Sequence, residues 1–256
     1  MGIKMEVLRV KLYQPFACYS LPFSFGVVNT YLLPPPSTIK GFIHSTAGVD
    51  RDYPIGLSIH GKIGGTTYEL QKLIKFDRPA SKSDKRRAGQ PKLVGFGKSL
   101  LKSPTYVEVL TDVFLTLYIY FPPESSLLKE AFLVNLLERE FPSLGRAEDL
   151  ARIVEEPRFV ELQPLDDELT LKEFSYFRKE TARELDLRGA LYRLPLSYDG
   201  ELAEKVGWRF FKKEDLLLAP PGQEVEPESE NLLCDPDEER AVELIEIPAG
   251  YRHVLG

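Results

Sequence analysis

The sequence has few of the residues that build metal centres and disulfide frameworks. Its 256 residues include 2 cysteines and 3 histidines. Cys18 and Cys234 are too few and too far apart for a disulfide framework or a zinc knuckle. The histidines, His44, His60 and His253, share no ligand-like spacing with a cysteine or with one another. We therefore expect no metal site, no cofactor and no redox chemistry.

Long hydrophobic runs are also lacking. The longest, Val113 to Phe121, contains Thr and Tyr and is about half as long as a membrane-spanning helix needs to be. Met1 to Val10 alternates charged and apolar residues and has no signal-peptide core or cleavage site. The 43% of hydrophobic and 28% of charged residues are typical of a globular chain. The sequence predicts a folded cytoplasmic protein with no membrane partner.

Common enzyme signatures are absent as well. Gly95 to Ser99 is similar to the end of a phosphate-binding loop, but Lys92 stands where the first glycine of that loop is required. No Gly-x-Ser-x-Gly or Gly-x-Gly-x-x-Gly motif is present. These absences exclude an NTPase and leave open an enzyme whose small-molecule site has no sequence motif.

Charge is distributed unevenly along a chain whose net charge is −6. Residues 72–103 carry 10 basic and 2 acidic side chains, and their Gly and Pro residues favour a long loop. This loop is either a solvated surface segment or a functional one. Gln223 to Glu239 carries 8 acidic residues and no basic one, which predicts a mobile loop.

The apolar pattern predicts an α+β fold. The expected N-terminal elements are a strand over 5–14, a helix over 34–48 capped by Ser37 or Thr38, a hairpin of 55–63 and 66–76 turning at Gly64-Gly65, a strand over 105–121, a helix from Ser125 or Ser126 to Glu140, and an edge or bulged strand over 152–162. Strand 105–121 is expected to pair with the strand ending at Phe76 as a long ribbon. This order predicts a ferredoxin-like, RRM-like domain with one insertion.

The domain boundaries follow from these elements. Residues 1–163 are expected to form the RRM-like domain, with the inserted loop at about 77–104. Residues 164–256 are expected to form a smaller β-rich region with the acidic loop 223–239. In that region we expect a helix over 169–185 and strands over 190–198, 208–218 and 241–247.

Several residues have the chemistry of RNA contacts. Ser37, Thr38 and Lys40 lie at a helix start, which can bind a phosphate or can be an ordinary helix cap. Arg9, Lys11 and Tyr13 share one side of the first strand, which can face RNA or simply solvent. In the basic loop, the apolar residues Leu93, Val94 and Phe96 lie between Lys92 and Lys98. They can enter between bases as a wedge, or they can fold back onto the core.

Three segments together resemble the Cas five family of CRISPR-associated proteins, which are RAMP-type subunits of type I Cascade surveillance complexes. They are Leu12 to Phe16, Asn29 to Gly41 and Leu144 to Leu150. The resemblance covers roughly residues 5–162 and is greatest to the type I-B members. It implies an RRM-like domain that binds the 5′ handle of the crRNA and a thumb hairpin that kinks the RNA.

The resemblance also implies roles for individual residues. Ser37, Thr38 and Lys40 would lie near the handle, and Arg146 would either lie near RNA or form an ion pair with Glu148 and Asp149. Leu93 and Phe96 would form the wedge of the thumb. The thumb residues placed on RNA would be Lys82, Lys85, Arg86, Arg87, Lys92 and Lys98.

The implied partners are the crRNA, the repeated backbone subunit, the large PAM-sensing subunit and, through the complex, target DNA. A second hypothesis is a metal-independent endoribonuclease, because the type I-C branch of the family cuts precursor crRNA. Its base would be His44, assisted by Lys40 and by Tyr31 or Tyr13. A half-buried helix more commonly holds a structural histidine, so we expect RNA binding without catalysis.

Overall fold

The computed structural model describes residues 4–22, 26–76, 100–138, 142–206, 210–227 and 231–250. Most of its regular structure is strand. The described helices are α1 (Pro36–Ala47), the 3-10 helix η2 (Pro123–Ser125), α2 (Ser126–Glu138), α3 (Lys179–Glu184) and α4 (Gly200–Val206). None of the helices in this part of the chain combines the length and the apolarity that membrane crossing requires.

The strands fall into an N-terminal and a C-terminal group. The first comprises β1 (Met5–Ala17), β2 (Tyr19–Ser20), β3 (Val27–Val28), β4 (Thr30–Tyr31), β5 (Ile55–Phe76), β6 (Leu100–Tyr120), β7 (Arg152–Ile153) and β8 (Arg158–Pro164). The second comprises β9 (Leu169–Thr170), β10 (Phe174–Arg178), β11 (Ala190–Tyr198), β12 (Phe211–Ala219), β13 (Glu224–Val225), β14 (Leu232–Asp235), β15 (Arg240–Glu243) and β16 (Ile245–Ile247).

Four strands form the centre of the sheet, in the order β5-β6-β1-β8. Each neighbouring pair is antiparallel. Along the chain, β1, α1, β5, β6, α2 and β8 follow one another in the β-α-β-β-α-β order that the sequence predicts, and the long connection lies between the two middle strands. The molecule is therefore a mixed α/β protein built mainly of strands.

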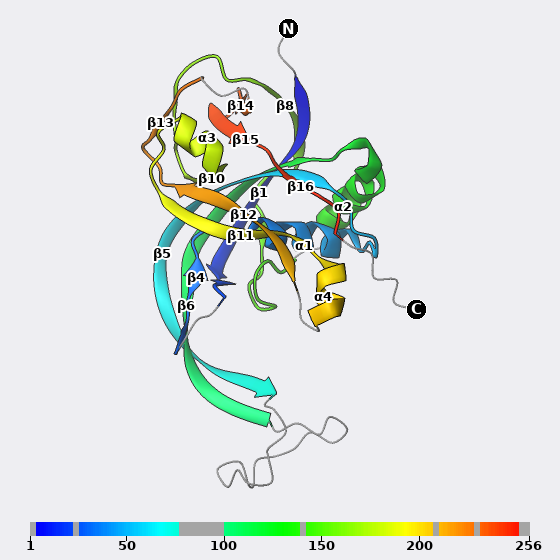
Figure 1. Cartoon of the computed structure of the whole chain (residues 1–256), viewed down its shortest axis with the longest axis vertical. Coiled ribbons are helices and arrows are strands. Elements are labelled where there is room, and N and C mark those ends of the chain that lie inside the picture. The colour runs from blue at the N-terminus through cyan, green and yellow to red at the C-terminus, as the bar shows by residue number, and fades with distance from the viewer. Residues whose placement is uncertain are drawn as a thin grey trace.

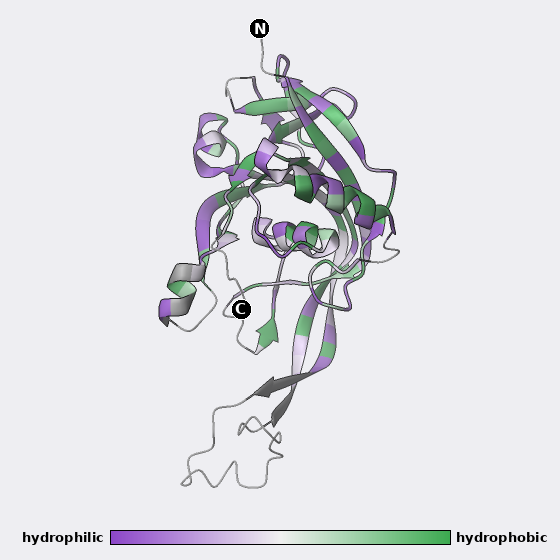
Figure 2. Cartoon of the chain, turned by 90° about the vertical axis from the view of Figure 1, so that its right-hand side faces the viewer, coloured by the Kyte–Doolittle hydropathy of each residue, from purple (hydrophilic) through white to green (hydrophobic). Residues whose placement is uncertain are grey.

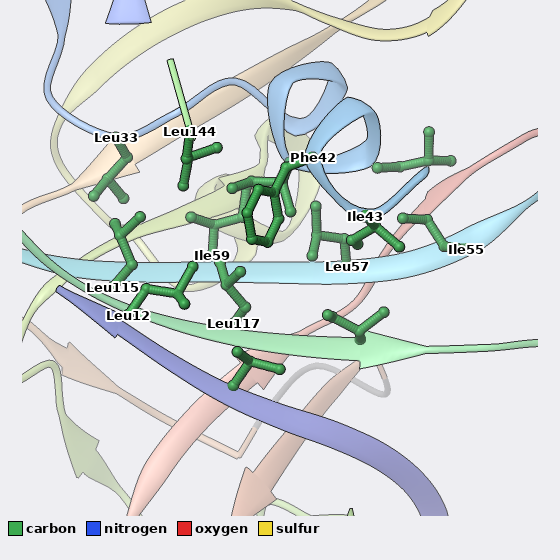
Figure 3. Close-up of a cluster of buried hydrophobic side chains, with 14 of the residues drawn as sticks. Leu12, Leu33, Phe42, Ile43, Ile55, Leu57, Ile59, Leu115, Leu117 and Leu144 are labelled. Atoms are coloured by element: carbon green, nitrogen blue, oxygen red, sulfur yellow. The ribbon is translucent and has the colours of Figure 1, made fainter. Parts of the chain in front are cut away.

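Helix α1 packs on one face of this sheet and creates the main core. It begins after Pro35 and ends before Gly48, whose φ of 67° is the left-handed conformation that glycine favours at a helix C-terminus. Figure 3 shows Phe42 and Ile43 of α1 above leucine and isoleucine side chains of β5 and β6. Fully burying one such side chain is worth about 1.5–3 kcal/mol, so this layer fixes α1 on the sheet.

The C-terminal strands continue the same sheet at both edges. β10 and β16 pair with β5, and β14 pairs with β8. In Figure 1 β14 and β15 lie near β8, although they are far from it in sequence. The boundary between residues 163 and 164 stays a prediction, and the region beyond it shares its sheet with the N-terminal strands.

Strands β5 and β6 form a long ribbon. They pair from Gly56 and Tyr120 to Phe76 and Leu100, as the sequence predicts for the strand that ends at Phe76. The ribbon leaves the body of the molecule (Figure 1) and carries hydrophobic as well as hydrophilic residues (Figure 2). At the far end of the ribbon, Phe76 of β5 and Leu100 of β6 lead into residues 77–99, which lie outside the described residues.

The predicted hairpin at Gly64-Gly65 is wrong, because both glycines lie inside the continuous strand β5. The glycine at 64 permits a close cross-strand approach instead of a turn. A Cβ atom on Gly64 would lie 2.8 Å from the Cβ of Asp112, which has a φ of 51°. Two glycines in a β-rich run therefore mark an irregular point of the ribbon.

Three further predictions need correction. A helix over 169–185 is wrong, because 174–178 is strand β10 and pairs with β5 and β12, leaving only α3 helical. The prediction that 223–239 is a mobile loop is also wrong, since this segment contains β13 and all of β14. The strand predicted over 152–162 is two strands, β7 and β8, interrupted around Pro157.

Two glycine substitutions test how closely the core side chains pack against strand β5. A Cβ on Gly61 would lie 2.5 Å from Leu33 Cδ2 and 3.0 Å from the Phe114 carbonyl oxygen, whereas a Cβ on Gly41 of α1 meets nothing within 4 Å. We expect Gly61→Ala to lower the free energy of unfolding by about 1–3 kcal/mol. Gly41→Ala should raise it by about 0.5–1 kcal/mol. Urea unfolding of both variants measures this, and equal effects would contradict the packing.

Candidate nucleic-acid interface

The face of β1 opposite the helices carries Arg9, Lys11 and Tyr13. The cross-strand partners of these residues in β6 are Tyr118, Thr116 and Phe114 in that order. The sequence predicted that all three β1 side chains face solvent or RNA. The structure separates them, because another part of the chain covers one end of this face.

Arg9 is buried, with 1% of its surface exposed. Its Nη1 lies 2.5 Å from Oδ2 of Asp235, and the Tyr118 hydroxyl donates to the same carboxylate oxygen at 2.8 Å. Burial, and the carboxylate of Asp235, raise the pKa of Tyr118 far above its usual range. The prediction that Arg9 lies on an open face is therefore wrong, because a residue predicted to belong to a mobile loop closes over it.

Residues Asp235–Glu239, which connect β14 to β15, are called the acidic turn below. The Lys11 ammonium lies 2.7 Å from Glu238 of this turn and 3.2 Å from Glu155. Partial burial would raise the pKa of the Glu238 carboxyl, but Lys11 lowers it below its usual value. Lys11 is thus held in an ion pair within the molecule and is not the free cation that the sequence predicted.

Tyr13 lies beyond the acidic turn, at the open end of the same face. Its hydroxyl donates to Asp112 Oδ1 at 2.8 Å, and its ring centroid lies 4.8 Å from that of Phe114. The Arg152 guanidinium lies 5.4 Å from the Tyr13 ring. Of the three predicted β1 side chains, Tyr13 is the one that does not pair with the acidic turn, and its ring remains available for a contact with RNA.

The start of α1 differs from the prediction that Ser37 or Thr38 caps it. Pro35 occupies the cap position and no side chain caps the helix. The Thr38 N–H donates to the Pro35 carbonyl at 2.8 Å, and both predicted residues are partly buried. The helix therefore begins about two residues earlier, because two prolines with fixed φ start it.

Lys40 is buried and faces the C-terminal segment. Its Nζ lies 2.7 Å from Oδ1 of Asp52 and donates to the Pro248 carbonyl at 2.8 Å. Burial lowers the pKa of Lys40, and the carboxylate of Asp52 opposes this effect. The geometry gives Lys40 a structural ion pair, so it does not present its charge to a phosphate at the helix start.

His44 has both ring nitrogens occupied by the fold. Nδ1 lies 2.9 Å from the Lys40 carbonyl oxygen, the Tyr53 N–H donates to Nε2 at 3.0 Å, and Nε2 lies 3.1 Å from Oδ1 of Asp52. Tyr31 packs its ring edge-on against Tyr192, with centroids 5.4 Å apart. Among the described residues, no hydrogen bond or ring contact joins Tyr31 to His44, so Tyr31 is not part of the group that His44 and Lys40 form with Asp52.

The Leu144 to Leu150 motif forms a compact ion-paired turn. Nε and Nη2 of Arg146 contact the Asp149 carboxylate at 3.0 and 2.7 Å. Asp149 is buried and also accepts the Cys18 N–H at 2.9 Å, and Glu148 lies 3.4 Å from Arg146. Of the two roles considered for Arg146, the geometry favours the ion pair, which ties this turn to the end of β1.

The basic residues predicted for the thumb lie outside the described residues, as do both wedge residues. These are Lys82, Lys85, Arg86, Arg87, Lys92, Leu93, Phe96 and Lys98. Their roles stay predictions. In the part of the chain that is described, no group of three or more His, Cys, Asp and Glu side chains is arranged to hold a metal ion.

The sequence analysis missed Phe114, Lys62 and Arg152, which lie in the same cross-strand row as Tyr13. Phe114 and Lys62 are cross-strand partners, and Arg152 pairs with Tyr13. Each residue by itself is an ordinary strand residue. Only the register of four strands brings them together, and no spacing along the chain encodes that register.

A comparison with protein families finds a match to part of the chain. Residues 7–93 match the model of a family described as "CRISPR-associated protein (Cas_Cas5)". This segment is similar to the Cas five family. The match covers about a third of the chain, includes β1, α1 and β5, and supports the resemblance carried by the sequence motifs. No curated protein matches the chain.

Three solved structures resemble the fold at low identity. A chain of a "CRISPR RNA-guided surveillance complex" is 15% identical, with 84% of this chain and 90% of that chain covered and a TM-score of 0.46. A chain of a "Type III-B Cmr-beta bound to cognate target RNA and AMPPnP" is 12% identical, with 91% and 98% covered and a TM-score of 0.42. A "Crystal structure of Cas protein" is 16% identical, with 96% and 98% covered and a TM-score of 0.37.

Asp52 and its two partners, Lys40 and His44, are called the Asp52 cluster, and they predict that the stability of the protein depends on pH. Burial would raise the pKa of Asp52, but His44 and Lys40 lower it from 3.8 to about 2. A carboxyl whose pKa is lowered by folding stabilises the folded state above its unfolded pKa and loses this effect as pH falls through its folded pKa. We expect Asp52→Asn to cost about 1–2 kcal/mol at pH 7, after allowance for partial exposure, and progressively less from pH 4 downward.

The measurement is the difference in unfolding free energy between wild type and Asp52→Asn as a function of pH. The neighbouring Asp50→Asn is the matched control, because Asp50 is exposed and forms no ion pair among the described residues. A difference that stays constant between pH 7 and pH 3 would contradict the cluster.

The buried Arg9 pair predicts unequal effects of two acidic residues in the acidic turn. Asp235→Ala leaves a buried guanidinium without its hydrogen-bonded carboxylate, and we expect a loss of about 3–5 kcal/mol. Asp237 is 61% exposed and lies 3.9 Å from Arg9, so Asp237→Ala should cost less than about 1 kcal/mol. Thermal and urea unfolding distinguish the two, and a mild effect of Asp235→Ala would show that the turn does not seal the face.

Proposed function

We propose that this protein is a non-catalytic RNA-binding subunit of a type I CRISPR Cascade complex that caps the 5′ handle of the crRNA. The observation that carries this proposal is the match of residues 7–93 to the Cas five family. The type I-B members are the proposed nearest group, on the strength of the three sequence motifs. The proposed location is the cytoplasm, where such a complex would meet invading DNA.

The topology supports a RAMP-type domain. Four antiparallel strands in the order β5-β6-β1-β8, with α1 and α2 inserted in the β-α-β-β-α-β order, have the arrangement of a ferredoxin-like fold. The connection between the two middle strands carries seven Lys and Arg residues within 77–99. We propose this segment as the thumb, because the ribbon of β5 and β6 leads into and out of it.

The thumb supplies most of the proposed RNA contacts. Lys82, Lys85, Arg86, Arg87, Lys92 and Lys98 would neutralise phosphates, and Leu93 and Phe96 would enter between bases. In the folded body, Tyr13, Ser37 and Thr38 remain candidates for contacts with the handle. Four of the predicted cations form ion pairs within the protein: Arg9, Lys11, Lys40 and Arg146. We propose that they stabilise the fold around the RNA interface and do not contact RNA themselves.

The proposed partners are the crRNA, the backbone subunit beside the thumb, and the large PAM-sensing subunit. Target DNA would be reached only through the assembled complex. Within the part of the chain that the structure describes, the geometry around His44 does not favour RNA cleavage, because both of its ring nitrogens are occupied and Lys40 is paired with Asp52. We therefore propose binding without cleavage as the function.

The test is a gel assay of the full chain with a labelled CRISPR repeat RNA in EDTA, which resolves binding and cleavage together. We expect binding without a cut, with affinity falling steeply as salt rises because bound phosphates release counterions. Reversing Lys85, Arg86 and Arg87 to Glu should weaken binding at least about tenfold. A specific cut that is lost in His44→Ala would instead identify a processing nuclease.

A second charge reversal is the matched control. Arg183, Arg188 and Arg193 are exposed and lie in or near α3 and β11, far along the chain from the ribbon. Changing all three to Glu alters the net charge by the same amount, so RNA binding should change little. If both triple variants weaken binding equally, the thumb assignment is lost and only a general charge effect remains.

A further inference from the structure

One cross-strand row on the open sheet face has an unusual composition. Arg152 of β7 pairs with Tyr13 of β1, Tyr13 pairs with Phe114 of β6, and Phe114 pairs with Lys62 of β5. The row therefore reads cation, aromatic, aromatic, cation across four neighbouring strands. With about 4.8 Å between strands, it spans roughly 14 Å of surface.

The rings of this row are held in place and accessible. Phe114 is 45% exposed, which is a large exposed fraction for an aromatic residue in the middle of a sheet. Its ring centroid lies 4.8 Å from that of Tyr13, with 44° between the planes, and the Tyr13 hydroxyl donates to Asp112. Phe114 thus offers an ordered apolar surface with one side open to solvent.

The two cations at the ends of the row are also exposed. Arg152 lies over the Tyr13 ring, and Lys62 borders the groove that Phe114 lines. In the described residues, neither has a carboxylate within ion-pair distance, whereas Lys11 in the preceding row is paired with Glu238 and Glu155. The positive charges of this row are therefore available to a ligand, whereas the charge of Lys11 in the neighbouring row is neutralised.

The acidic turn limits how a ligand can reach the row. It covers Arg9 and Lys11, and its carboxylates would repel a phosphate at that end of the face. An anionic chain can therefore approach from the side of the ribbon. Flat rings between free cations match the chemistry of an unpaired nucleotide, whose base stacks and whose phosphates carry negative charge.

We propose that the row Arg152–Tyr13–Phe114–Lys62 binds one unpaired base of a single-stranded RNA. The base stacks on Phe114, and the flanking phosphates lie against Arg152 and Lys62. This proposal rests on the proposed RNA-binding function and assigns to it a stacking site on the body of the protein, separate from the thumb.

The test uses the full chain and an oligouridylate of about 15 nucleotides with 4-thiouridine at each position, a length within the range that one binding domain covers. Irradiation cross-links a stacked base to its neighbour, and peptide mapping identifies the attached residue. Affinity is measured in parallel for wild type, Phe114→Ala and Phe114→Trp. Phe159→Ala is the matched control, because Phe159 is 39% exposed and also lies beside a cation, Lys129, at 4.2 Å.

We expect cross-links to Tyr13 or Phe114 and about tenfold weaker binding for Phe114→Ala, with wild-type affinity for Phe114→Trp and Phe159→Ala. Wild-type binding and cross-links in Phe114→Ala would overturn the stacking site and leave the RNA-binding function intact. No binding of RNA by the wild type would overturn both. Tighter binding of the matched deoxyuridine oligonucleotide would overturn RNA as the occupant.

Discussion

The buried ion pair between Arg9 and Asp235 constrains much of this structure. A guanidinium in the middle of a sheet face costs several kcal/mol to bury unless carboxylates compensate it. Asp235 provides the direct contact, and Glu155, Asp237 and Glu238 all lie within 4 Å of the same guanidinium. The C-terminal acidic turn must therefore dock on β1, and its strands extend the sheet beyond β8.

The same physical rule explains why residues with RNA-binding chemistry are used inside the protein. Lys40 and Asp52 join α1 to the segment at Pro248, and Asp149 joins the Arg146 turn to the end of β1. Lys40 meets a carboxylate that lies beyond the end of its helix, whereas Arg146 meets one in its own turn, and that carboxylate also accepts the Cys18 N–H of the next element. A conspicuous motif can therefore be required for folding, and its charges need not reach a ligand.

The sequence predicted the N-terminal architecture because local patterns encode it. Alternation in β1, the helical pattern that ends at Gly48, and the β-rich runs around the basic segment were sufficient for the β-α-β-β-α-β order, although the cap of α1 was wrongly assigned to Ser37 or Thr38. The hairpin at Gly64-Gly65 failed because glycine permits close strand approach as well as turns. The prediction of a mobile loop over 223–239 failed because this segment holds eight carboxylates and no cation of its own, whereas in the fold the acidic turn meets Arg9 and Lys11.

Net charge is a poor guide to where this protein can bind an anion. The chain carries −6, but Asp235 and Glu238 of the acidic turn are committed to Arg9, Lys11 and Arg240. Pairing removes those cations and those anions from the surface together. What remains for a ligand is determined by the unpaired groups, and Arg152 and Lys62, at either end of the Tyr13 and Phe114 rings, are unpaired cations among the described residues of this face. The fold thus divides one continuous face into a sealed half that stabilises the protein and an open half with the chemistry to hold a nucleotide.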